Sequence, residues 1–301
     1  MRQDEKEKKR VKIWWCVTGI FIAFAIYCLI EIRRELNDFH VTRYQVSSGR
    51  LEYMKRPGKI IFLSDLHNRT YGSENVRLWE KILDEQPDLI LIGGDMLVRK
   101  DGNSYEETLK FLKKLPQICP VYCANGNHEQ KLKEKPECYK QSYEAYKKEL
   151  EQSGLHMLEN DSETVEVNGQ KMILTGLEIP LWAYARFSKK KLPAKEITDR
   201  IGTCQDGYQI LLAHHPAYME KYLEWGADLV LSGHYHGCVV GLPGIGGVIS
   251  PNFMLFPKYS GGIYRDGDRT MIVSKGLGTH SVPIRLWNWP ELIVLELKGY
   301  K

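Results

Sequence analysis

The chain has 301 residues, of which 43% are hydrophobic and 27% are charged, a composition typical of a folded protein with one large core or two modest ones. Its formal net charge is +4, but six basic and three acidic residues within residues 1–12 contribute +3 of it. The remainder is near neutral, so the charge gives no argument for a nucleic-acid partner.

The first expected element is a membrane-spanning helix at Ile13–Ile30. This stretch has 18 residues without a charge, and at about 1.5 Å per residue it just reaches across a hydrocarbon core of about 30 Å. The alternatives are a cleaved signal peptide, with a small-residue site at Ala23–Ala25, and a buried core helix. Because the apolar sequence continues to Ile30 and Trp14 and Trp15 stand like interfacial anchors, we expect a retained single-pass anchor.

The basic residues around this helix predict its orientation. Six Lys and Arg residues precede it, whereas only Arg33, Arg34 and Arg43 follow closely, so residues 1–12 are expected to be a basic cytoplasmic tail. Residues 31–56 would then be a connector, and residues 57–301 a domain outside the cell membrane. The soluble part has five cysteines without paired spacing, which suits a reducing compartment or an anaerobic exterior and weakly opposes the outward orientation.

Beyond the connector, short apolar runs alternate with amphipathic segments. Strands are expected at Ile60–Leu63, Leu89–Ile92, Val121–Ala124, Met172–Thr175, Ile210–Ala213 and Leu229–Leu231, and helices at Glu74–Gln86, Tyr105–Leu115 and Tyr139–Gln152. This alternation predicts an α/β sandwich built around largely parallel strands. The C-terminal runs Met271–Ser274 and Leu292–Leu297 are expected to be strands of a second sheet.

A polar cluster follows five of the expected strands. The clusters are Ser64-Asp65-Leu66-His67-Asn68, Gly93-Gly94-Asp95, Gly126-Asn127-His128-Glu129, His214-His215-Pro216 and Gly233-His234-Tyr235-His236-Gly237. The carboxyl ends of strands form the edge where open α/β sheets bind ligands, so these side chains are expected to meet there. Each cluster alone is a weak signal, but six of the nine histidines fall inside the five clusters.

The residue types in these clusters indicate a metal site. Carboxylates, imidazoles and one amide oxygen suit Mn, Fe, Zn or a similar ion, whereas Mg and Ca sites are nearly all oxygen. Because the donors are too many for one ion, we expect two divalent transition-metal ions about 3.5–4 Å apart, sharing a carboxylate, as in many phosphoryl-transfer sites.

The ordered set Asp65-x-His67, Gly94-Asp95, Gly126-Asn127-His128-Glu129, His214 and Gly233-His234-x-His236 resembles the five-block signature of the calcineurin-like metallophosphoesterases. The resemblance covers about residues 57–301. The Asp65-Leu66-His67-Asn68 form, the anchor and the C-terminal Lys275-Gly276-Leu277-Gly278, Arg285 and Pro290-Glu291 resemble the membrane-associated bacterial phosphodiesterase branch. The resemblance implies a four-layer α/β/β/α sandwich of two mixed β-sheets, preceded here by one transmembrane helix.

The resemblance also implies the roles of the ligands. One metal would be held by Asp65, His67, Asp95 and His236, and the other by Asp95, Asn127, His214 and His234, with Asp95 bridging. The family's strand-His-x-Pro pattern favours His214 over His215 as a ligand. Relatives often carry an acid three residues after the bridging Asp, where this chain has Val98, so the orientation of His128 is unexplained unless Asp101 substitutes for that acid.

The activity expected from this site is hydrolysis of a phosphodiester related to lipid or the cell envelope, by in-line attack of a metal-bridging hydroxide. His128 is the expected general acid, with a supporting structural role as its alternative. Arg99, His215 and Arg285 are candidate substrate-binding residues. The Pro180–Pro193 loop, which includes Lys189–Lys191, is expected either to touch lipid headgroups or cover the site, or to be a solvated loop. Residues Gly237–Gly267 are expected to form one wall of the site.

Other functions of the same fold are a phosphomonoesterase or protein phosphatase, a nuclease, and a non-catalytic partner-binding sandwich. The near-neutral domain argues against the nuclease, and the complete ligand set argues against the non-catalytic form. We therefore expect a small-molecule or lipid-linked phosphoester as substrate and the membrane as a partner, with no nucleic acid and no obligate protein partner.

Overall fold

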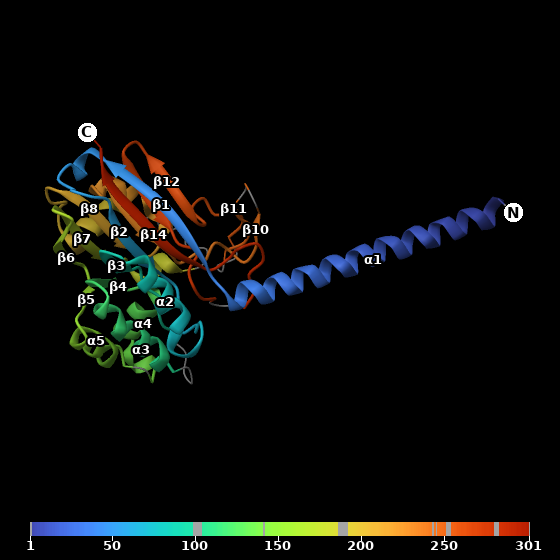
Figure 1. The fold of residues 1–301 in the computed structure, drawn as a ribbon, viewed down its shortest axis with the longest axis horizontal. Helices are drawn as coiled ribbons and strands as arrows, with labels where there is room; N and C mark the ends of the chain where they lie inside the picture. Colours follow the sequence, from blue (N-terminus) through green and yellow to red (C-terminus); the bar gives the residue numbers. More distant parts are fainter. Residues whose placement is uncertain are drawn as a thin grey trace.

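A computed structural model describes residues 2–98, 104–140, 142–185, 192–242, 244, 246–250, 254–279 and 283–300. Figure 1 shows one long helix leading into a layered domain. Two six-stranded sheets form the centre of that domain, with strand orders β1-β14-β2-β3-β4-β5 and β12-β13-β9-β8-β7-β6. Both sheets are mixed, as expected from the sequence.

The first sheet contains β1 (His40–Ser48), β14 (Glu291–Gly299), β2 (Gly58–Leu63), β3 (Leu89–Ile92), β4 (Val121–Ala124) and β5 (Leu155–Leu158). Strands β2 to β5 run parallel, and β14 pairs antiparallel with β2 and parallel with β1. The central strands are short and buried along their whole length, which is typical of parallel strands covered on both faces.

The second sheet contains β12 (Gly262–Asp266), β13 (Arg269–Val273), β9 (Leu229–Ser232), β8 (Tyr208–Ala213), β7 (Gln170–Leu177) and β6 (Asp161–Val167). Strands β13, β9, β8 and β7 run parallel, and the two edge strands are antiparallel to their neighbours. A separate two-stranded ribbon is formed by β10 (Gly241–Leu242) and β11 (Gly246–Gly247).

The two sheets face each other across an apolar core, to which Phe62, Leu91, Leu212 and Leu231 contribute. The outer face of the first sheet is covered by α2 (Val76–Glu85), α3 (Glu106–Lys114) and α5 (Tyr143–Gln152). The outer face of the second is covered by α6 (Ala194–Ile201) and α7 (Met219–Trp225), with the short helix Leu181–Tyr184 beside them. These layers confirm the expected α/β/β/α sandwich. Helix α4 (Asn127–Glu134) and further short helices at Gly49–Leu51, Ser73–Asn75, Leu115–Gln117, Pro136–Cys138 and Pro216–Tyr218 complete the fold.

One strand lies in a different sheet from the one the sequence indicated. The run Leu292–Leu297 forms β14, which lies in the first sheet between β1 and β2, so its expected place in the second sheet is wrong. The run Met271–Ser274 does belong to the second sheet, as β13 beside β9. The apolar pattern predicted both strands but carries no information on which partner each one takes.

The N-terminal helix α1 runs without interruption from Arg2 to Asn37. Residues Glu5–Asn37 are long and apolar enough to cross a membrane, with a mean hydropathy of 2.2 in the most apolar 18-residue window, which is not buried in the protein. The expected connector 31–56 provides the last turns of α1, strand β1 and the short helix Gly49–Leu51. Since β1 pairs with β14 over nine residues, this segment forms part of the sandwich.

Candidate metal centre

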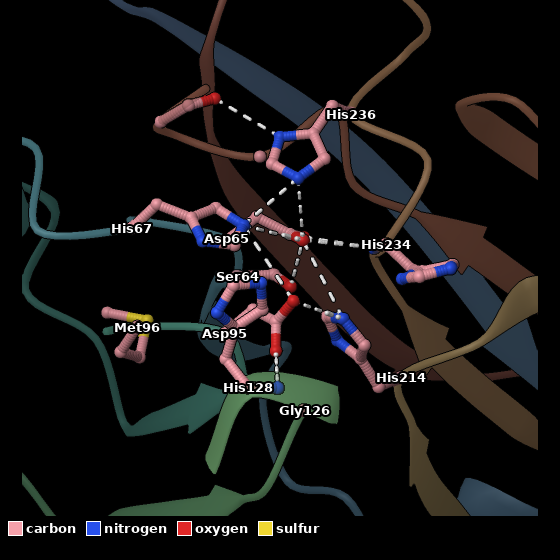
Figure 2. Close-up of polar contacts among 12 residues, drawn as sticks. Ser64, Asp65, His67, Asp95, Met96, Gly126, His128, His214, His234 and His236 are labelled. Atoms are coloured by element: carbon pink, nitrogen blue, oxygen red, sulfur yellow. Dashed lines mark hydrogen bonds and ion pairs between the residues drawn. The ribbon is translucent and has the colours of Figure 1, made fainter. Parts of the chain in front are cut away.

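Six of the seven expected ligands lie close together in Figure 2, namely Asp65, His67, Asp95, His214, His234 and His236. Each of the seven lies shortly after a strand: Asp65 and His67 after β2, Asp95 after β3, Asn127 at the start of α4 after β4, His214 after β8, and His234 and His236 after β9. Strands β2, β3 and β4 run parallel in the first sheet, and β8 and β9 run parallel in the second. Their carboxyl ends therefore lie at the same edge of each sheet. The polar clusters, which lie far apart in the sequence, therefore form one site.

The first ligand group consists of Asp65, His67 and His236, each of which brings one ligand atom within 4.8 Å of the other two. His236 Nε2 lies 3.3 Å from Asp65 Oδ1 and 3.1 Å from His67 Nε2. His236 Nδ1 faces the Gly278 carbonyl at 3.2 Å, and donation to that oxygen leaves the Nε2 lone pair directed at the carboxylate. This tautomer suits a metal ligand.

The second group consists of Asp95, His214 and His234, which bring ligand atoms together in the same way. His214 Nε2 lies 3.2 Å from Asp95 Oδ2, and its Nδ1 faces the Gly93 carbonyl at 2.7 Å, again leaving Nε2 as the donor to a cation. Asp95 Oδ2 also lies 3.7 Å from His67 Nε2. Asp95 therefore lies close to members of both groups, a position that suits a bridging ligand.

Asn127 is the first residue of α4 and immediately precedes His128. Asn127 Oδ1 is buried and has no hydrogen-bond partner among the described residues. Buried polar atoms are rarely left unpaired, so an orphaned amide oxygen on the residue before His128 fits the ligand role that the family resemblance implies for Asn127. The donor set is oxygen and nitrogen without thiolate, as the sequence predicted for a borderline transition metal.

The ligands are held in an uncommon backbone conformation. Asp65, His67, Asp95, His234 and His236 all have φ between +48° and +70°, in the left-handed region. Residues other than glycine rarely adopt it, and such positions concentrate at functional sites. The turns also need glycine: a Cβ on Gly94, with φ +90°, would lie 2.1 Å from the backbone nitrogen of Gly126.

Buried carboxylates and imidazoles strongly affect one another's pKa in this site. Burial alone raises the pKa of Asp65, but the imidazoles of His236 and His214 outweigh burial and hold this pKa below its ordinary value. Burial also raises the pKa of Asp95, but the imidazoles of His214, His128 and His67 together outweigh burial and hold this pKa below its ordinary value. The same carboxylates, acting against burial, raise the pKa of His214 to about 10. A divalent cation supplies the charge that these anions attract, so the residues present fit a bound metal.

His128 lies at the edge of both groups. Its backbone N–H donates to Asp95 Oδ1 over 2.8 Å, and its ring meets the His67 ring edge to face with centroids 4.9 Å apart. One of its ring nitrogens lies within 4.8 Å of the ligand atoms of His67 and Asp95. This position is close enough to the site for the expected proton donor. Asp101, the suggested substitute for the acid missing at Val98, lies outside the described residues.

Three residues around the site were not given a role by the sequence. Glu129 accepts hydrogen bonds from the backbone N–H groups of Asp95 and Met96, both at 2.8 Å, and also from those of Leu97 and Gly126. Burial and the charge of Asp95 raise the pKa of Glu129 to about 7. The available signal was its place at the third position of α4, where an acid caps backbone N–H groups.

The other two are Tyr184 and Asn288. The Tyr184 ring lies 5.1 Å from that of His234, so the beginning of the Pro180–Pro193 loop packs against the second ligand group. Residues 186–191 of that loop, including Lys189–Lys191, lie outside the described residues. Asn288 Nδ2 donates to the carbonyl of His236 over 2.6 Å and to that of Cys238. No local motif marked either residue.

The three candidate substrate-binding residues have different surroundings. Arg285 is 1% exposed and its guanidinium donates to the carbonyls of Lys275, Gly276, Gly278 and Asn288, which gives it a supporting position behind the first ligand group. His215 packs its ring 4.5 Å from that of His234, and burial lowers its pKa to about 3. Arg99 lies outside the described residues.

Comparison with known proteins identifies similar sequences. A family model described as calcineurin-like phosphoesterase matches residues 58–238. The uncharacterized metallophosphoesterase YkoQ of Bacillus subtilis (strain 168) is 24% identical over 274 residues, which cover 91% of this chain and 94% of the relative. Phosphodiesterase YaeI of Escherichia coli (strain K12) is 27% identical over 84% of this chain and 88% of the relative.

Among solved structures, the phosphopantetheinyl hydrolase PptH from Mycobacterium tuberculosis matches 74% of this chain and 90% of its own chain, with 12% identity and a TM-score of 0.44. The family-model match covers β2 to β9 and every residue of both ligand groups.

Proposed function

We propose, since this chain belongs to the calcineurin-like phosphoesterase family, that it hydrolyses phosphodiesters with the help of two divalent transition-metal ions. The observation that carries the proposal is the position of Asp95, whose carboxylate lies between the Asp65, His67 and His236 group and the His214 and His234 group. One carboxylate shared by two sets of donors is the arrangement of two-metal phosphoryl-transfer sites.

The assignment of ligands follows the two groups. Asp65, His67, Asp95 and His236 would hold one ion, and Asp95, Asn127, His214 and His234 the other. When bound, such ions provide Lewis-acid stabilisation for the charge that develops on the phosphoryl oxygens. Manganese, iron and zinc all suit the mixed oxygen and nitrogen donors.

The protein itself contributes orientation and proton transfer. Glu129 fixes the turn that carries Asp95, and the carbonyls of Gly93 and Gly278 orient the imidazoles of His214 and His236. His128 is fixed by its backbone bond to Asp95, and its imidazole is the group we assign to protonate the leaving oxygen of the ester.

Two observations support a phosphodiester of the membrane or cell envelope. The relative YaeI is named a phosphodiesterase, and α1 has the length and hydropathy of a membrane span directly attached to the domain. We propose that α1 is a retained anchor with its N-terminus in the cytoplasm, which places the metal centre outside the cell.

The test is a substrate panel with full-length protein in detergent, loaded with manganese. Aryl and alkyl phosphodiesters, the matching phosphomonoesters and pyrophosphates are compared by kcat/KM, with Asp95→Asn as the inactive control. We expect the diesters to be hydrolysed fastest. Faster hydrolysis of the monoesters would contradict the proposed substrate class, and no hydrolysis above the Asp95→Asn control would contradict the proposed activity.

A further inference from the structure

The domain has an apolar edge beside α1, formed by residues 239–241, 248–250, 254–256 and 284–287, which we call the helix-side edge. These segments are joined by backbone hydrogen bonds: Leu286 bonds with Val239 and Gly241, Val239 with Ile249, and Val248 with Phe256. The isolated bridges between Val240 and Leu286 and between Ile249 and Leu255 belong to the same network. The edge is therefore one continuous structure, and Figure 1 shows the adjoining ribbon β10–β11 near the end of α1.

The helix-side edge contacts the apolar part of α1. The ring of Trp287 lies 6.4 Å from that of Phe24, and its indole N–H donates to the Tyr27 hydroxyl over 3.4 Å. Phe24 lies six residues before Ile30, the end of the uncharged run, which corresponds to about 9 Å along a helix. The edge thus reaches past the end of the uncharged run, to the depth of its last turns.

The same edge exposes large apolar side chains. Met254, Leu255, Phe256 and Ile284 are 47%, 64%, 59% and 39% exposed. Outside α1, the other exposed large hydrophobic residues among those described are Tyr53, Val76, Leu83 and Tyr300, so half of all such residues gather here. Exposed apolar side chains that gather on one edge of a domain mark an interaction site with a protein or a membrane.

Two aromatic residues of the edge have uncommon backbone conformations. Phe256 and Trp287 have φ of +46° and +54°, in the left-handed region that bulky side chains rarely adopt. Such conformations persist where the surrounding structure imposes them, and they often accompany function. In Phe256 the ring is exposed, and in Trp287 the ring lies against Phe24 of α1.

The edge is also connected to the metal centre. Asn288 follows Trp287, and its side chain donates to the carbonyls of His236 and Cys238. Its backbone N–H donates over 3.0 Å to Glu35 Oε2 in the last turns of α1. A single residue therefore links a metal ligand, the helix-side edge and the end of the membrane helix.

We propose that the helix-side edge inserts into the outer part of the bilayer that α1 spans, through the interfacial layer to the adjoining hydrocarbon, so that the domain lies on the membrane with the His236 side of the metal centre next to the phospholipid headgroups. The proposal rests on the membrane anchor in the proposed function. The occupant is the bilayer because the edge touches α1 at the depth of the span, and because the aromatic residues Tyr27 and Trp287 meet there, as in interfacial aromatic belts. A soluble protein partner could reach this surface only by entering the bilayer around α1.

The test uses full-length protein in nanodiscs of phosphatidylcholine and phosphatidylglycerol. The photocrosslinker p-benzoylphenylalanine replaces one residue at a time: Phe256 or Leu255 on the edge, Tyr53 as an equally exposed control, and Phe21 as a reference inside the span. After illumination, mass spectrometry measures the fraction of protein carrying a phospholipid adduct. Leu255 provides a second position in case the substitution disturbs the left-handed backbone at Phe256, and circular dichroism verifies the fold of each variant.

We expect adducts at Phe21, Phe256 and Leu255, with yields at the two edge positions several-fold above that at Tyr53. Adducts at Phe21, combined with edge yields no higher than that at Tyr53, would overturn the insertion of the edge and leave the anchor intact. Absence of adducts at Phe21 would overturn the anchor and the insertion together.

Discussion

At the scale of single residues, His128 has a role that kinetics can separate from support of the metals. Because a general acid contributes in the transition state, we expect His128→Ala to lower turnover about 10²-fold, while metal content and substrate affinity stay nearly unchanged. The expected loss is at the lower end of the range for such catalysis because Val98 stands where relatives often carry an orienting acid. Steady-state kinetics and elemental analysis of the same samples measure both quantities.

The leaving group provides the control for this prediction. An aryl ester needs little protonation as it leaves, whereas an alkyl ester needs much, so the variant should lose little activity on the first and much on the second. An equal loss on both esters, together with lower metal occupancy, would assign His128 a supporting role.

Glu129 offers a second test, because its carboxylate accepts four backbone N–H groups around Asp95. In Glu129→Gln one oxygen is replaced by an amide NH₂ that faces N–H donors, so we expect a destabilisation of about 1–3 kcal/mol and weaker metal binding. Denaturant unfolding and metal titration measure the two effects. The control Glu144→Gln changes an exposed carboxylate on α5 and should alter neither. A Glu129→Gln protein with unchanged stability and metal affinity would contradict the proposed role of this carboxylate.

The residues that could be predicted from the sequence are those whose chemistry is local. Histidines and acids immediately after apolar runs predicted that Asp65, His67, Asp95, His214 and His236 would meet at strand ends. Asn288 could not be predicted, because it bonds to the carbonyl of His236, more than fifty residues earlier in the chain. For Arg285 the sequence predicted a role that the structure does not support. The sequence indicated phosphate binding, but the guanidinium donates its hydrogen bonds to backbone carbonyls.

At the scale of elements, the end of α1 is attached to the catalytic domain through a buried carboxylate. Glu35 is fully buried and accepts a hydrogen bond from the backbone N–H of Asn288. We expect Glu35→Ala to destabilise the domain by about 1–3 kcal/mol, since it leaves that N–H unpaired. Glu35→Gln keeps a carbonyl acceptor and should recover most of the stability. Thermal unfolding of the full chain in detergent measures both variants, and equal midpoints for Glu35→Ala and the parent would contradict the attachment.

The strands predicted from the sequence are those buried on both faces. Runs such as Ile60–Leu63 and Leu89–Ile92 are continuous and apolar, which is why their pattern is clear. The four edge strands β1, β5, β6 and β12 were missed because none of them is a continuous run of buried residues. The place of β14 was wrong for another reason: pairing with β2 and β1 depends on long-range packing that an apolar run does not encode.

At the scale of the whole molecule, the orientation in the membrane is testable in intact cells. If the basic residues before Ile13 hold the N-terminus inside, an impermeant protease should digest the domain without lysis. All seven cysteines are free thiols, a pattern more usual in a reducing compartment, so the outcome is informative in both directions. A cytoplasmic protein measured in the same cells is the control for leakage. Protection of the domain until lysis would reverse the assigned orientation.

The measurement that tests the central claim most directly is the metal content of active, purified full-length protein. We expect close to two equivalents of transition metal. A single ion cannot be bound by Asp65, His67 and His236 and also by Asn127, His214 and His234, so each of these two sets needs its own ion. Asp95→Asn should weaken both ions and be the most damaging single ligand change, whereas Asn127→Ala should chiefly empty one site. Active enzyme that repeatedly contains one equivalent or none would contradict the two-metal account.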